Sequence, residues 1–563
     1  MAATSAAPAL ANPDQPNIIF IVCDDADYHD FGFNSQDAQT PNIDALSVNG
    51  IVLSSFYTAG AKCSPTRASL LTGMHPLAVG LNENWVDTTE VVQGRNGLRG
   101  LPSPPQLGTE LTTQGYATAH FGKWHIGQAR TMYLPDAQGF QHWLLPKGGY
   151  TGNQHVRSHL GDFTVNVTYR PTWLTDQVLD YLDTEATAPF FINVWYLTPH
   201  TPLHVPPGFD NQPFQFDLAS PRGMVLAMMQ QVDLEIGRIM QKVTDLGLRD
   251  NTLLIVTSDN GGQAASNAAQ RDFRGTKGNF LEGGIHVPFV AQWPACIPSN
   301  TVNQSLVTSM DMLPTLMDIA GASDEQIAGI SALGHGSPKT EALLNQQVLP
   351  HADILWHMKH VATPSEDRQA EYTYALRSGH YKLIKFQDRT TYNMYDLESD
   401  PYEGTNLVAS MPELFAEMHG KLLKRRQVCS RVPLIPWQVN QLQTIPFDPR
   451  FDICGGDLTF VTVLEIPSPA YAGGNLIRKP GSFDLRITPE KKVALTIDGV
   501  SEEGTNSVID LLSAPLSPGI HEIALGLTGH RRSNTVATLY VDGMEVDVFD
   551  QADILWILHS NTS

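Results

Sequence analysis

The 563-residue sequence predicts an α/β fold in which helices sandwich a large mixed, mostly parallel sheet, followed by a small α+β subdomain and an extra C-terminal β-sandwich. Continuous apolar, β-branched runs at 17–23, 190–196 and 252–257 are typical of strands buried on both faces of a parallel sheet. A helical period of apolar residues covers 224–246, between the last two runs, and strands that alternate with helices indicate an α/β sheet. From about residue 433, Pro and Gly separate segments of alternating polarity, which predicts antiparallel strands.

The changes of pattern along the chain predict three folded regions after a flexible N-terminal tail at 1–15. We expect the α/β domain at 16–325, and a chain of this length has room for roughly two to four domains. A smaller α+β subdomain with an antiparallel sheet is expected at 326–432, because 372–397 contains two or three short strand patterns followed by a helical one. The remainder, 433–563, is expected to form a β-rich accessory domain.

The composition excludes some partners and leaves the compartment open. A formal net charge of −22 argues against nucleic acid, whose binding depends on basic surface that releases counterions from phosphates. No apolar run is long enough to span a bilayer. The N-terminal residues lack an intact signal peptide, so we expect a periplasmic or secreted protein if a signal peptide has been removed and a cytoplasmic one otherwise. Five cysteines are too few for a disulfide scaffold, although Cys429 and Cys454 could pair.

Acidic and amide side chains follow two of the predicted buried strands. Asp24 and Asp25 come directly after the first run, and Asp259 and Asn260 follow the run at 252–257. Ligands of α/β sheets bind at the carboxyl ends of the strands, so these four oxygen donors can converge on one hard cation, Ca²⁺ or Mg²⁺. The alternative for any one of them is an ordinary turn or helix cap.

A cysteine stands where a loop is expected to enter a helix. In the segment CSPTRASLLTG, Pro65 fits the first helical turn and Gly73 the helix end. Cys63 is thus expected before a helix N-terminus, where the helix dipole and Arg67, about one turn onward, would stabilise an anion on or beside it. The alternative is that Cys63 is a small buried apolar residue.

The same segment resembles the signature of the type I sulfatases of the alkaline phosphatase superfamily, in which Cys-x-Pro-x-Arg is followed by Ala-Ser-Leu-Leu-Thr-Gly. Further family landmarks follow in the family's order over about 16–425: NIIFIVCDD, TPNIDAL, GYATAHFGKWHIG, TPHTPLHVP, TSDNGG, RGTKGNFLEGGIHVP and YDLESDPYE. The resemblance implies an alkaline phosphatase-like catalytic domain that hydrolyses a sulfate ester.

The resemblance also implies the cofactors. The family's cysteine is oxidised to formylglycine, so Cys63 would require a formylglycine-generating enzyme. The resemblance implies that the cation is held by Asp24, Asp25, Asp259 and Asn260. The cation would also contact the sulfate and residue 63. Hydration of the aldehyde gives a geminal diol, of which one hydroxyl attacks sulfur and the other allows the sulfate to be expelled.

Basic side chains would form the floor of this site. Lys123 and His125, one residue apart, would point the same way in an extended segment. The resemblance implies that Lys123 binds the sulfate and residue 63, and that His125 is the base for the formylglycine hydroxyl. It assigns His200, which follows the strand at 190–196, to the ester and its leaving oxygen, and Lys277 to the sulfate oxygens. Together with Arg67 these groups would offset the anionic charge.

Several points stay open in the sequence. His286 stands where the family often has Arg, in EGGI-x-VP. Residues that either contact the substrate or simply pack are Trp85, Trp124, Trp143, His155 and His204.

Two alternative functions remain. One is a phosphonate monoester hydrolase or phosphodiesterase of the same superfamily, and the other is an inactive sulfate- or glycan-binding protein. The segment 521–546 resembles the lectin-like jelly rolls of the laminin G type, and a packing domain is the alternative.

Overall fold

The computed structural model describes 15–81, 84, 106–127, 133–187, 189–210, 215–264, 273–333, 335–350, 353–358, 372–386 and 391–429, and the backbone of eight strands between 458 and 551. The chain divides into two compact units, the first of which ends at Cys429 while the second contains Ser430–Ser563. The finer domain boundaries expected from the sequence, at 325 and 432, stay predictions.

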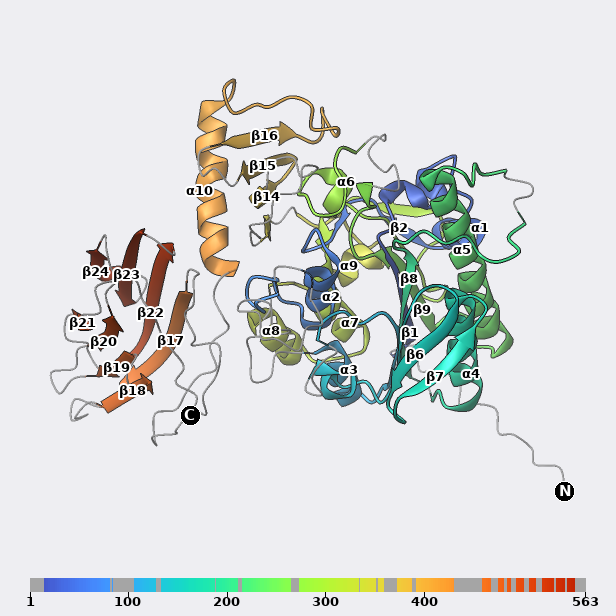
Figure 1. Ribbon diagram of the computed structural model, residues 1–563, viewed down its shortest axis with the longest axis horizontal. Helices are drawn as coiled ribbons and strands as arrows, with labels where there is room; N and C mark the ends of the chain where they lie inside the picture. The colour runs from blue at the N-terminus through green and yellow to red at the C-terminus, as the bar shows by residue number, and fades with distance from the viewer. Residues whose placement is uncertain are drawn as a thin grey trace. The chain divides into compact units, whose positions relative to one another are not determined.

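A mixed ten-stranded sheet forms the centre of the first unit (Figure 1). In spatial order its strands are β11 (Thr301–Asn303), β2 (Ile51–Leu53), β10 (Phe289–Gln292), β9 (Thr252–Ser258), β1 (Asn17–Asp24), β8 (Phe190–Pro199), β4 (Ala117–Gly122), β5 (His142–Lys147), β6 (Gly152–Ser158) and β7 (Phe163–Val167). The central run β9-β1-β8-β4-β5 is parallel, and β10, β6 and β7 add antiparallel pairs on either side. The predicted mostly parallel sheet is confirmed.

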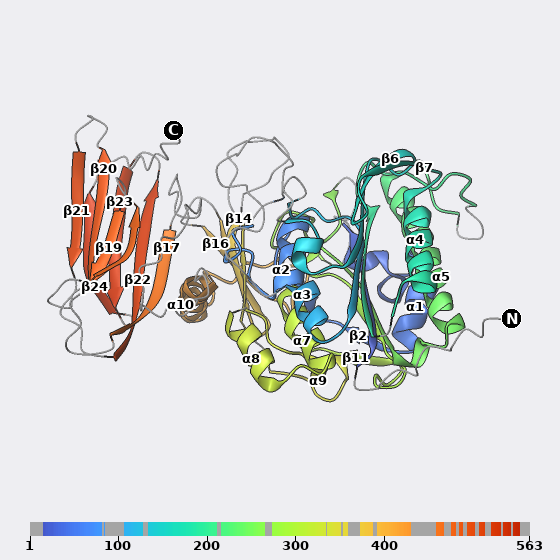
Figure 2. The same ribbon diagram turned by 90° about the horizontal axis from the view of Figure 1, so that it is seen from below.

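The central strands are buried because both faces of the sheet are covered. Figure 2 shows α1 (Pro41–Val48), α4 (Arg170–Thr184) and α5 (Pro221–Asp245) on one face, and α2 (Cys63–Thr72), α3 (Leu107–Thr113) and α7 (Met312–Ile319) on the other. All eight residues of β1 are buried. The apolar side of α5 packs against this sheet through Met229, Val232, Ile236, Ile239 and Val243, which recur at the spacing of a helix face. Burial on both faces explains the unbroken apolar runs of the sequence.

The register of the parallel strands brings their carboxyl ends together. Cys23 of β1 pairs with Ser258 of β9, and the amide of Asp259 donates to the carbonyl of Cys23 over 3.2 Å. Each strand therefore ends at the same edge of the sheet, directly before the acidic residues. Shorter elements nearby are β3 (Phe56–Tyr57), which pairs in parallel with β12 (Val307–Thr308), and the helices α6 (Glu282–Ile285), α8 (Asp324–Leu333) and α9 (Thr340–Leu343).

A smaller antiparallel sheet completes the first unit. It consists of β13 (Ile354–His357), β14 (Tyr372–Ser378), β15 (Tyr381–Phe386) and β16 (Tyr392–Asp396), and α10 (Pro412–Cys429) packs on it. Met418 and Leu422 of α10 contact the apolar face of this sheet. The predicted strands and helix are present, with β13 as an additional strand. No helix within the described ranges has the length and apolar character to span a membrane.

The second unit contains two antiparallel sheets of four strands each. One has the order β17 (Leu458–Ile466), β22 (Gly519–His530), β23 (Ser533–Val541), β24 (Met544–Gln551). The other has the order β18 (Gly474–Lys479), β19 (Phe483–Ile487), β20 (Val493–Val500), β21 (Asn506–Leu512). The alternating segments of the sequence thus form strands, as two sheets of the kind that build β-sandwiches.

Candidate active site

Three carboxylates and an amide meet where β1 and β9 end. Asp24, Asp25, Asp259 and Asn260 are each at most 3% exposed. The backbone amide of Asp25 donates to Oδ1 of Asp259 over 3.2 Å, and Nδ2 of Asn260 donates to Oδ1 of Asp25 over 2.6 Å. Asp25 has a φ of 68°, in the left-handed region that costs energy for most residues, so its carboxylate is held by the surrounding structure. The two acidic pairs of the sequence therefore form one cluster.

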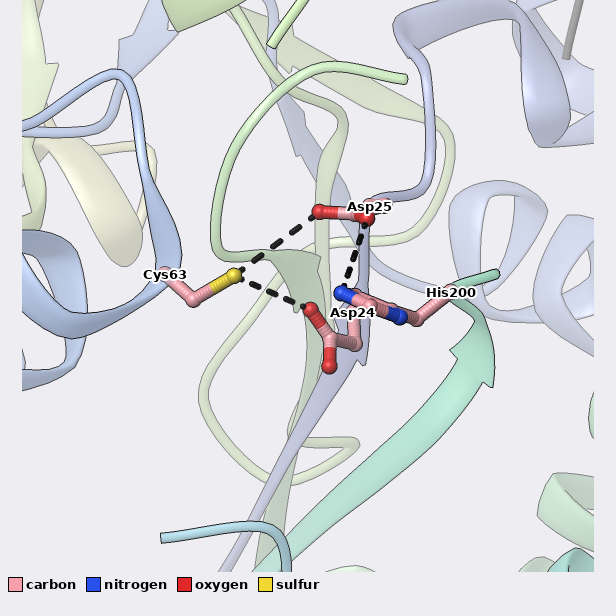
Figure 3. A group of neighbouring side chains, drawn as sticks. All are labelled: Asp24, Asp25, Cys63 and His200. Atoms are coloured by element: carbon pink, nitrogen blue, oxygen red, sulfur yellow. Dashed lines mark hydrogen bonds and ion pairs between the residues drawn. The ribbon is translucent and has the colours of Figure 1, made fainter. Parts of the chain in front are cut away.

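Cys63 lies at the centre of this cluster, as the first residue of α2. Its Sγ atom is 3.4 Å from Oδ1 of Asp24 and 3.9 Å from Oδ1 of Asp25 (Figure 3), and Nζ of Lys277 is 3.1 Å from it on another side. Burial, reinforced by Asp24, raises the pKa of the Cys63 thiol above its usual range. Burial and Asp24 thus outweigh the nearby cations for the unmodified residue, which is held as the thiol, and the expectation of an anion on or beside residue 63 stays a prediction.

Two lysines face the carboxylates from separate loops. Nζ of Lys123 forms a very short ion pair with Asp24, and Nζ of Lys277 lies 2.6 Å from Oδ1 of Asp25. Although burial opposes the charge, these contacts keep the pKa of each lysine above its usual range. Burial likewise works against the ionised Asp24, but Lys123 and Arg67 outweigh it and hold its pKa below the ordinary value. Both lysines are therefore charged in the site.

Arg67 is fully buried and acts on the neighbouring groups. Its Nε and Nη2 atoms lie 2.8 and 2.6 Å from Oδ2 of Asp259, and its Nη1 donates to the carbonyl of Lys123 over 3.0 Å. The guanidinium also lies over the ring of Trp195, 5.0 Å from its centre. Arg67 thus fixes one carboxylate of the cluster and the loop that carries Lys123.

The two histidines reach the site differently. Nε2 of His200 lies 3.6 Å from Oδ2 of Asp25, and its Nδ1 lies 2.5 Å from the carbonyl of Thr201. His125 has a φ of 62°, so the segment from Lys123 is not extended and the predicted reason for their common direction is wrong. The carbonyl of His125 accepts a hydrogen bond from Oγ of Ser64 over 2.6 Å, which ties its backbone to the residue after Cys63.

The donor set fits a hard divalent cation. One ligand atom each from Asp24, Asp25, Cys63 and His200 lies within 4.8 Å of the others. Oδ1 of Asn260 is buried and accepts no hydrogen bond from the residues that the structure describes. A buried carbonyl oxygen without a donor is costly, and coordination by a cation would satisfy it. Carboxylate and amide oxygens in this number suit Ca²⁺ or Mg²⁺ better than zinc.

Three supporting residues were not predicted. Gln263 donates a very short hydrogen bond to Asp25 and accepts one from Oγ1 of Thr201 over 2.9 Å, which links a carboxylate to the His200 loop. The hydroxyl of Tyr150 donates to the carbonyl of His200 over 2.7 Å. Trp195 stacks on Arg67. Only Gln263 had a sequence cue, because it follows the Asp259-Asn260-Gly-Gly segment directly.

Five residues were expected either to contact the substrate or to pack, and the structure assigns two of them, Trp124 and Trp143, to packing. Trp85 lies outside the described residues. Trp124 and Trp143 are 0% and 3% exposed, so they pack in the core. His155 is half-exposed, and His204 stacks on Tyr150 and Tyr169, with ring centres 6.1 and 6.4 Å apart.

His286, the departure from the family pattern, is also buried. Its ring stacks on Tyr57 at 4.5 Å between centres. Its Nδ1 lies 2.9 Å from Oε2 of Glu282, and its Nε2 lies 2.9 Å from the carbonyl of Ser54.

Comparisons with known proteins identify the family of this chain. The Sulfatase family model matches 16–322, and the model described as "N-sulphoglucosamine sulphohydrolase, C-terminal" matches 276–428. Human arylsulfatase A is 29% identical over 514 residues, which cover 80% of this chain and 94% of that protein. Human N-acetylgalactosamine-6-sulfatase is 29% identical over 357 residues, which cover 58% of this chain and 66% of that protein.

Solved structures show the same fold. A crystal structure of Ps i-CgsB in complex with k-i-k-neocarrahexaose has a TM-score of 0.63 at 24% identity and covers 74% of this chain and 94% of its own. The phosphonate monoester hydrolase of Agrobacterium radiobacter has a TM-score of 0.56 at 21% identity and covers 74% of this chain and 96% of its own. Since the Sulfatase model alone spans more than half of the 563 residues, this chain is an enzyme of the sulfatase family, which hydrolyses sulfate esters and belongs to the alkaline phosphatase superfamily.

Proposed function

We propose that this enzyme cleaves a carbohydrate or aryl sulfate monoester with a formylglycine made from Cys63 and with a divalent cation, Ca²⁺ in preference to Mg²⁺. One observation carries the proposal: the buried Sγ of Cys63 lies 3.4 Å from Asp24 and 3.1 Å from Lys277, between the cation ligands and the basic floor. As a thiol with a raised pKa, residue 63 is a poor nucleophile. Oxidation to an aldehyde, which hydrates, is the chemistry that would make this position reactive.

The charges of the site support an anionic substrate. Asp24, Asp25 and Asp259 match Arg67, Lys123 and Lys277 in number, three acids against three bases, and four ion pairs connect these groups. A bound divalent cation would leave the site with a positive excess. A sulfate monoester, which carries one negative charge, would offset part of that excess inside an otherwise acidic protein.

Each side chain has a role that follows from its position. Asp24, Asp25, Asp259 and Asn260 would hold the cation, which would supply Lewis-acid stabilisation of negative charge, and the hydrated aldehyde would supply the nucleophilic hydroxyl. Among the chain's own groups, the lysines bind the sulfate oxygens and stabilise charge that develops on them. Arg67 holds Asp259 in place and contributes positive charge.

The two histidines handle protons. His200 lies beside Asp25 with its Nδ1 against a carbonyl, an arrangement in which Nδ1 donates and Nε2 faces the site. His200 is therefore our choice for the group that protonates the leaving oxygen. We assign His125 the role of accepting the proton of the second hydroxyl at position 63. The hydroxyl of Ser64, the residue after Cys63, donates to the carbonyl of His125 and holds the His125 backbone there.

The relatives support the substrate class at a coarse level. Human arylsulfatase A and human N-acetylgalactosamine-6-sulfatase are named for aryl sulfate and for a sulfated amino sugar. We extend both chemistries to this chain and favour a sulfated sugar as the substrate. The enzyme itself would act in a periplasmic or extracellular compartment. A formylglycine-generating enzyme is the partner that maturation requires.

Peptide mass analysis of protein from its native host tests the proposal. We expect the peptide that contains Cys63 to carry an aldehyde, whereas a peptide with Cys63 wholly as a thiol would contradict it and favour a binding protein. Purified enzyme is then compared on matched sulfate and phosphonate esters with the same leaving group. Faster turnover of the phosphonate ester would replace the proposed sulfatase specificity, and a panel of sulfated saccharides would name the substrate.

A further inference from the structure

A cluster of two histidines and a glutamate lies outside the candidate active site. It consists of His142 at the start of β5, His159 directly after β6, and Glu185 at the C-terminal end of α4. One ligand atom from each of the three residues lies within 4.8 Å of the others. Nδ1 of His142 is 3.0 Å from Oε2 of Glu185, and the two imidazole rings are 4.1 Å apart between their centres.

This cluster is distinct from the cation site of the active centre. His142 pairs with Ala119 in the middle of β4, three residues before Gly122 ends that strand. At about 3.3 Å per residue, this places His142 roughly 10 Å along the strand from the end where Lys123 enters the active site. His142 contacts Tyr181 of α4, and Figure 2 places α4 on the face of the sheet opposite to α2, which carries Cys63.

The first imidazole is held in place by packing. The His142 ring contacts Phe121 and Tyr181, with ring centres 5.3 and 4.8 Å away, and its side chain is 13% exposed. Nδ1 of His159 lies 3.3 Å from both the backbone amide nitrogen and the carbonyl oxygen of Trp143. A carbonyl is a usual outer partner of a metal-binding histidine, and in the tautomer in which Nδ1 donates to it, Nε2 is the nitrogen available to a metal.

The third ligand is free to adjust. The side chain of Glu185 is 52% exposed, so it can close on an ion while a water completes the coordination from the solvent side. Bond lengths of 2.0 to 2.1 Å in a tetrahedral site place ligand atoms about 3.4 Å apart, which requires only a small contraction of the present cluster. Ligation through Nδ1 of His142 moves its ring proton to Nε2, a change of tautomer that neutral imidazole allows.

We propose that His142, His159 and Glu185 bind one Zn²⁺ ion, which clips the β5 and β6 strands to the end of α4. Two imidazoles and one carboxylate form a ligand set typical of zinc, whereas Ca²⁺ and Mg²⁺ require oxygen ligands. Three protein ligands and a water make an open coordination shell, but the site lies away from the reacting groups and joins three elements of the first unit, so we assign it a structural role. The protein would then hold two kinds of metal, a hard cation in the active site and zinc in this clip.

Calorimetric titration of the full-length enzyme with Zn²⁺, in excess Ca²⁺ to fill the oxygen site, tests the proposal. We expect one Zn²⁺ per chain, and the same in Cys63→Ser, which rules out the active-site thiol as the ligand. His142→Ala and His159→Ala should each weaken Zn²⁺ binding by at least about 100-fold, and Glu185→Gln by about tenfold. Co²⁺ should give the absorption bands of a tetrahedral site in the wild type and lose them in His142→Ala.

The control is His380→Ala, which removes the single imidazole from the exposed group of His380, Asp396 and Glu398 and should leave the Zn²⁺ affinity unchanged. Glu185 is exposed, so Glu185→Gln should fold normally and keeps the test valid even if a histidine variant is unstable. Wild-type affinity in the His142, His159 and Glu185 variants, or no uptake of Zn²⁺ in the presence of Ca²⁺, would overturn the proposal. Neither result depends on sulfatase activity.

Discussion

Two buried clusters of charge lie in the first unit, and they are built differently. In the one beside α6, Nζ of Lys382 lies 2.7 Å from Oε1 of Glu282 and 2.7 Å from Oε1 of Glu403. The backbone amide of Glu282 donates to Oε2 of Glu403 over 2.7 Å, and the hydroxyl of Tyr57 donates to Oε2 of Glu282 over 2.5 Å. An ammonium group thus occupies the point between two carboxylates.

The active site also contains carboxylates and lysines, but there each lysine pairs with one carboxylate. Asp24 and Asp25 both face Sγ of Cys63, Lys123 pairs with Asp24, and Lys277 lies close to both Asp25 and Sγ of Cys63. Oδ1 of Asn260 remains without a hydrogen-bond donor in the described part of the chain. The arrangement fits a site for an ion and a substrate, whereas the Lys382 cluster is complete as it stands.

The comparison teaches that perturbed titration alone does not identify a functional site. Burial, with Glu282 nearby and only partly offset by Lys382, raises the pKa of Glu403 to about 7, yet this residue joins the small antiparallel sheet to the main body. The pKa of Asp24 is lowered, because Lys123 and Arg67 outweigh its burial. Both pKa values are shifted, so what separates the clusters is that Nζ of Lys382 pairs with the buried Oε1 of Glu403, whereas no donor among the described residues reaches Oδ1 of Asn260.

The largest expected effect comes from residue 63. Cys63→Ala should lower kcat/KM by at least about 10⁴-fold, because it removes the precursor of the nucleophile. Its melting temperature should stay near that of the wild type, since a small buried side chain is replaced by another. The matched control is Cys296→Ala, at an exposed cysteine, which should keep wild-type activity. Substantial turnover by Cys63→Ala would mean that residue 63 is not the precursor of the nucleophile.

Removal of the cation should have the next largest effect. After treatment with a chelator we expect activity to fall by at least about 10³-fold, because the carboxylate cluster then lacks the charge that binds the sulfate. Added Ca²⁺ should restore activity, and thermal unfolding should shift upward with its concentration. If activity survives exhaustive chelation, the oxygen cluster is not a cation site.

Breaking the Lys382 cluster should affect stability instead. Lys382→Met leaves Glu282 and Glu403 buried without their cation, which should lower the free energy of unfolding by about 3 to 5 kcal/mol. The folded fraction should retain its kcat, measured below the melting temperature. Lys421→Met, at a partly exposed lysine that pairs with Glu417, is the control and should change stability by less than about 1 kcal/mol. An intact stability with a reduced kcat would assign this cluster to catalysis.

The smallest of these effects concerns Gln263. Its hydrogen bond orients Asp25, so Gln263→Ala should weaken the affinity for the cation by about 10- to 100-fold and leave kcat at saturating Ca²⁺ close to that of the wild type. Gln231→Ala removes a glutamine that contacts Glu235 on α5 and should change neither quantity. A lower kcat that excess Ca²⁺ does not restore would mean that Gln263 acts on the substrate.

The sequence predicted what depends on local pattern. The unbroken apolar runs placed β1, β8 and β9, and the acidic residues directly after β1 and β9 meet because parallel strands end at one edge. The resemblance added Lys123 and Lys277, and the structure brings both lysines to the carboxylates. The strands could be predicted because neighbouring residues determine them, whereas the two lysines came from the resemblance and their roles stay predictions.

Other features depend on contacts between distant segments. His125 combines a left-handed backbone with a hydrogen bond from Ser64, 61 positions away, and the local sequence pattern did not predict this contact. Lys382 pairs with Glu282, which lies 100 positions away in the sequence, so no local pattern could predict that Lys382 is the cation of a buried cluster. The short strand β13 was missed because its four residues are too few for a clear alternation.

The complete burial of Cys63 has a consequence for the order of events in the life of the protein. Its side chain is 0% exposed, beneath the carboxylates and Lys277. On the proposed function, a maturation enzyme would have to bring Cys63 into its own active site, and it could do so only before α2 docks on the sheet. Activity would then be decided once, during synthesis or export, and a molecule that folds with the thiol intact could be rescued only by unfolding.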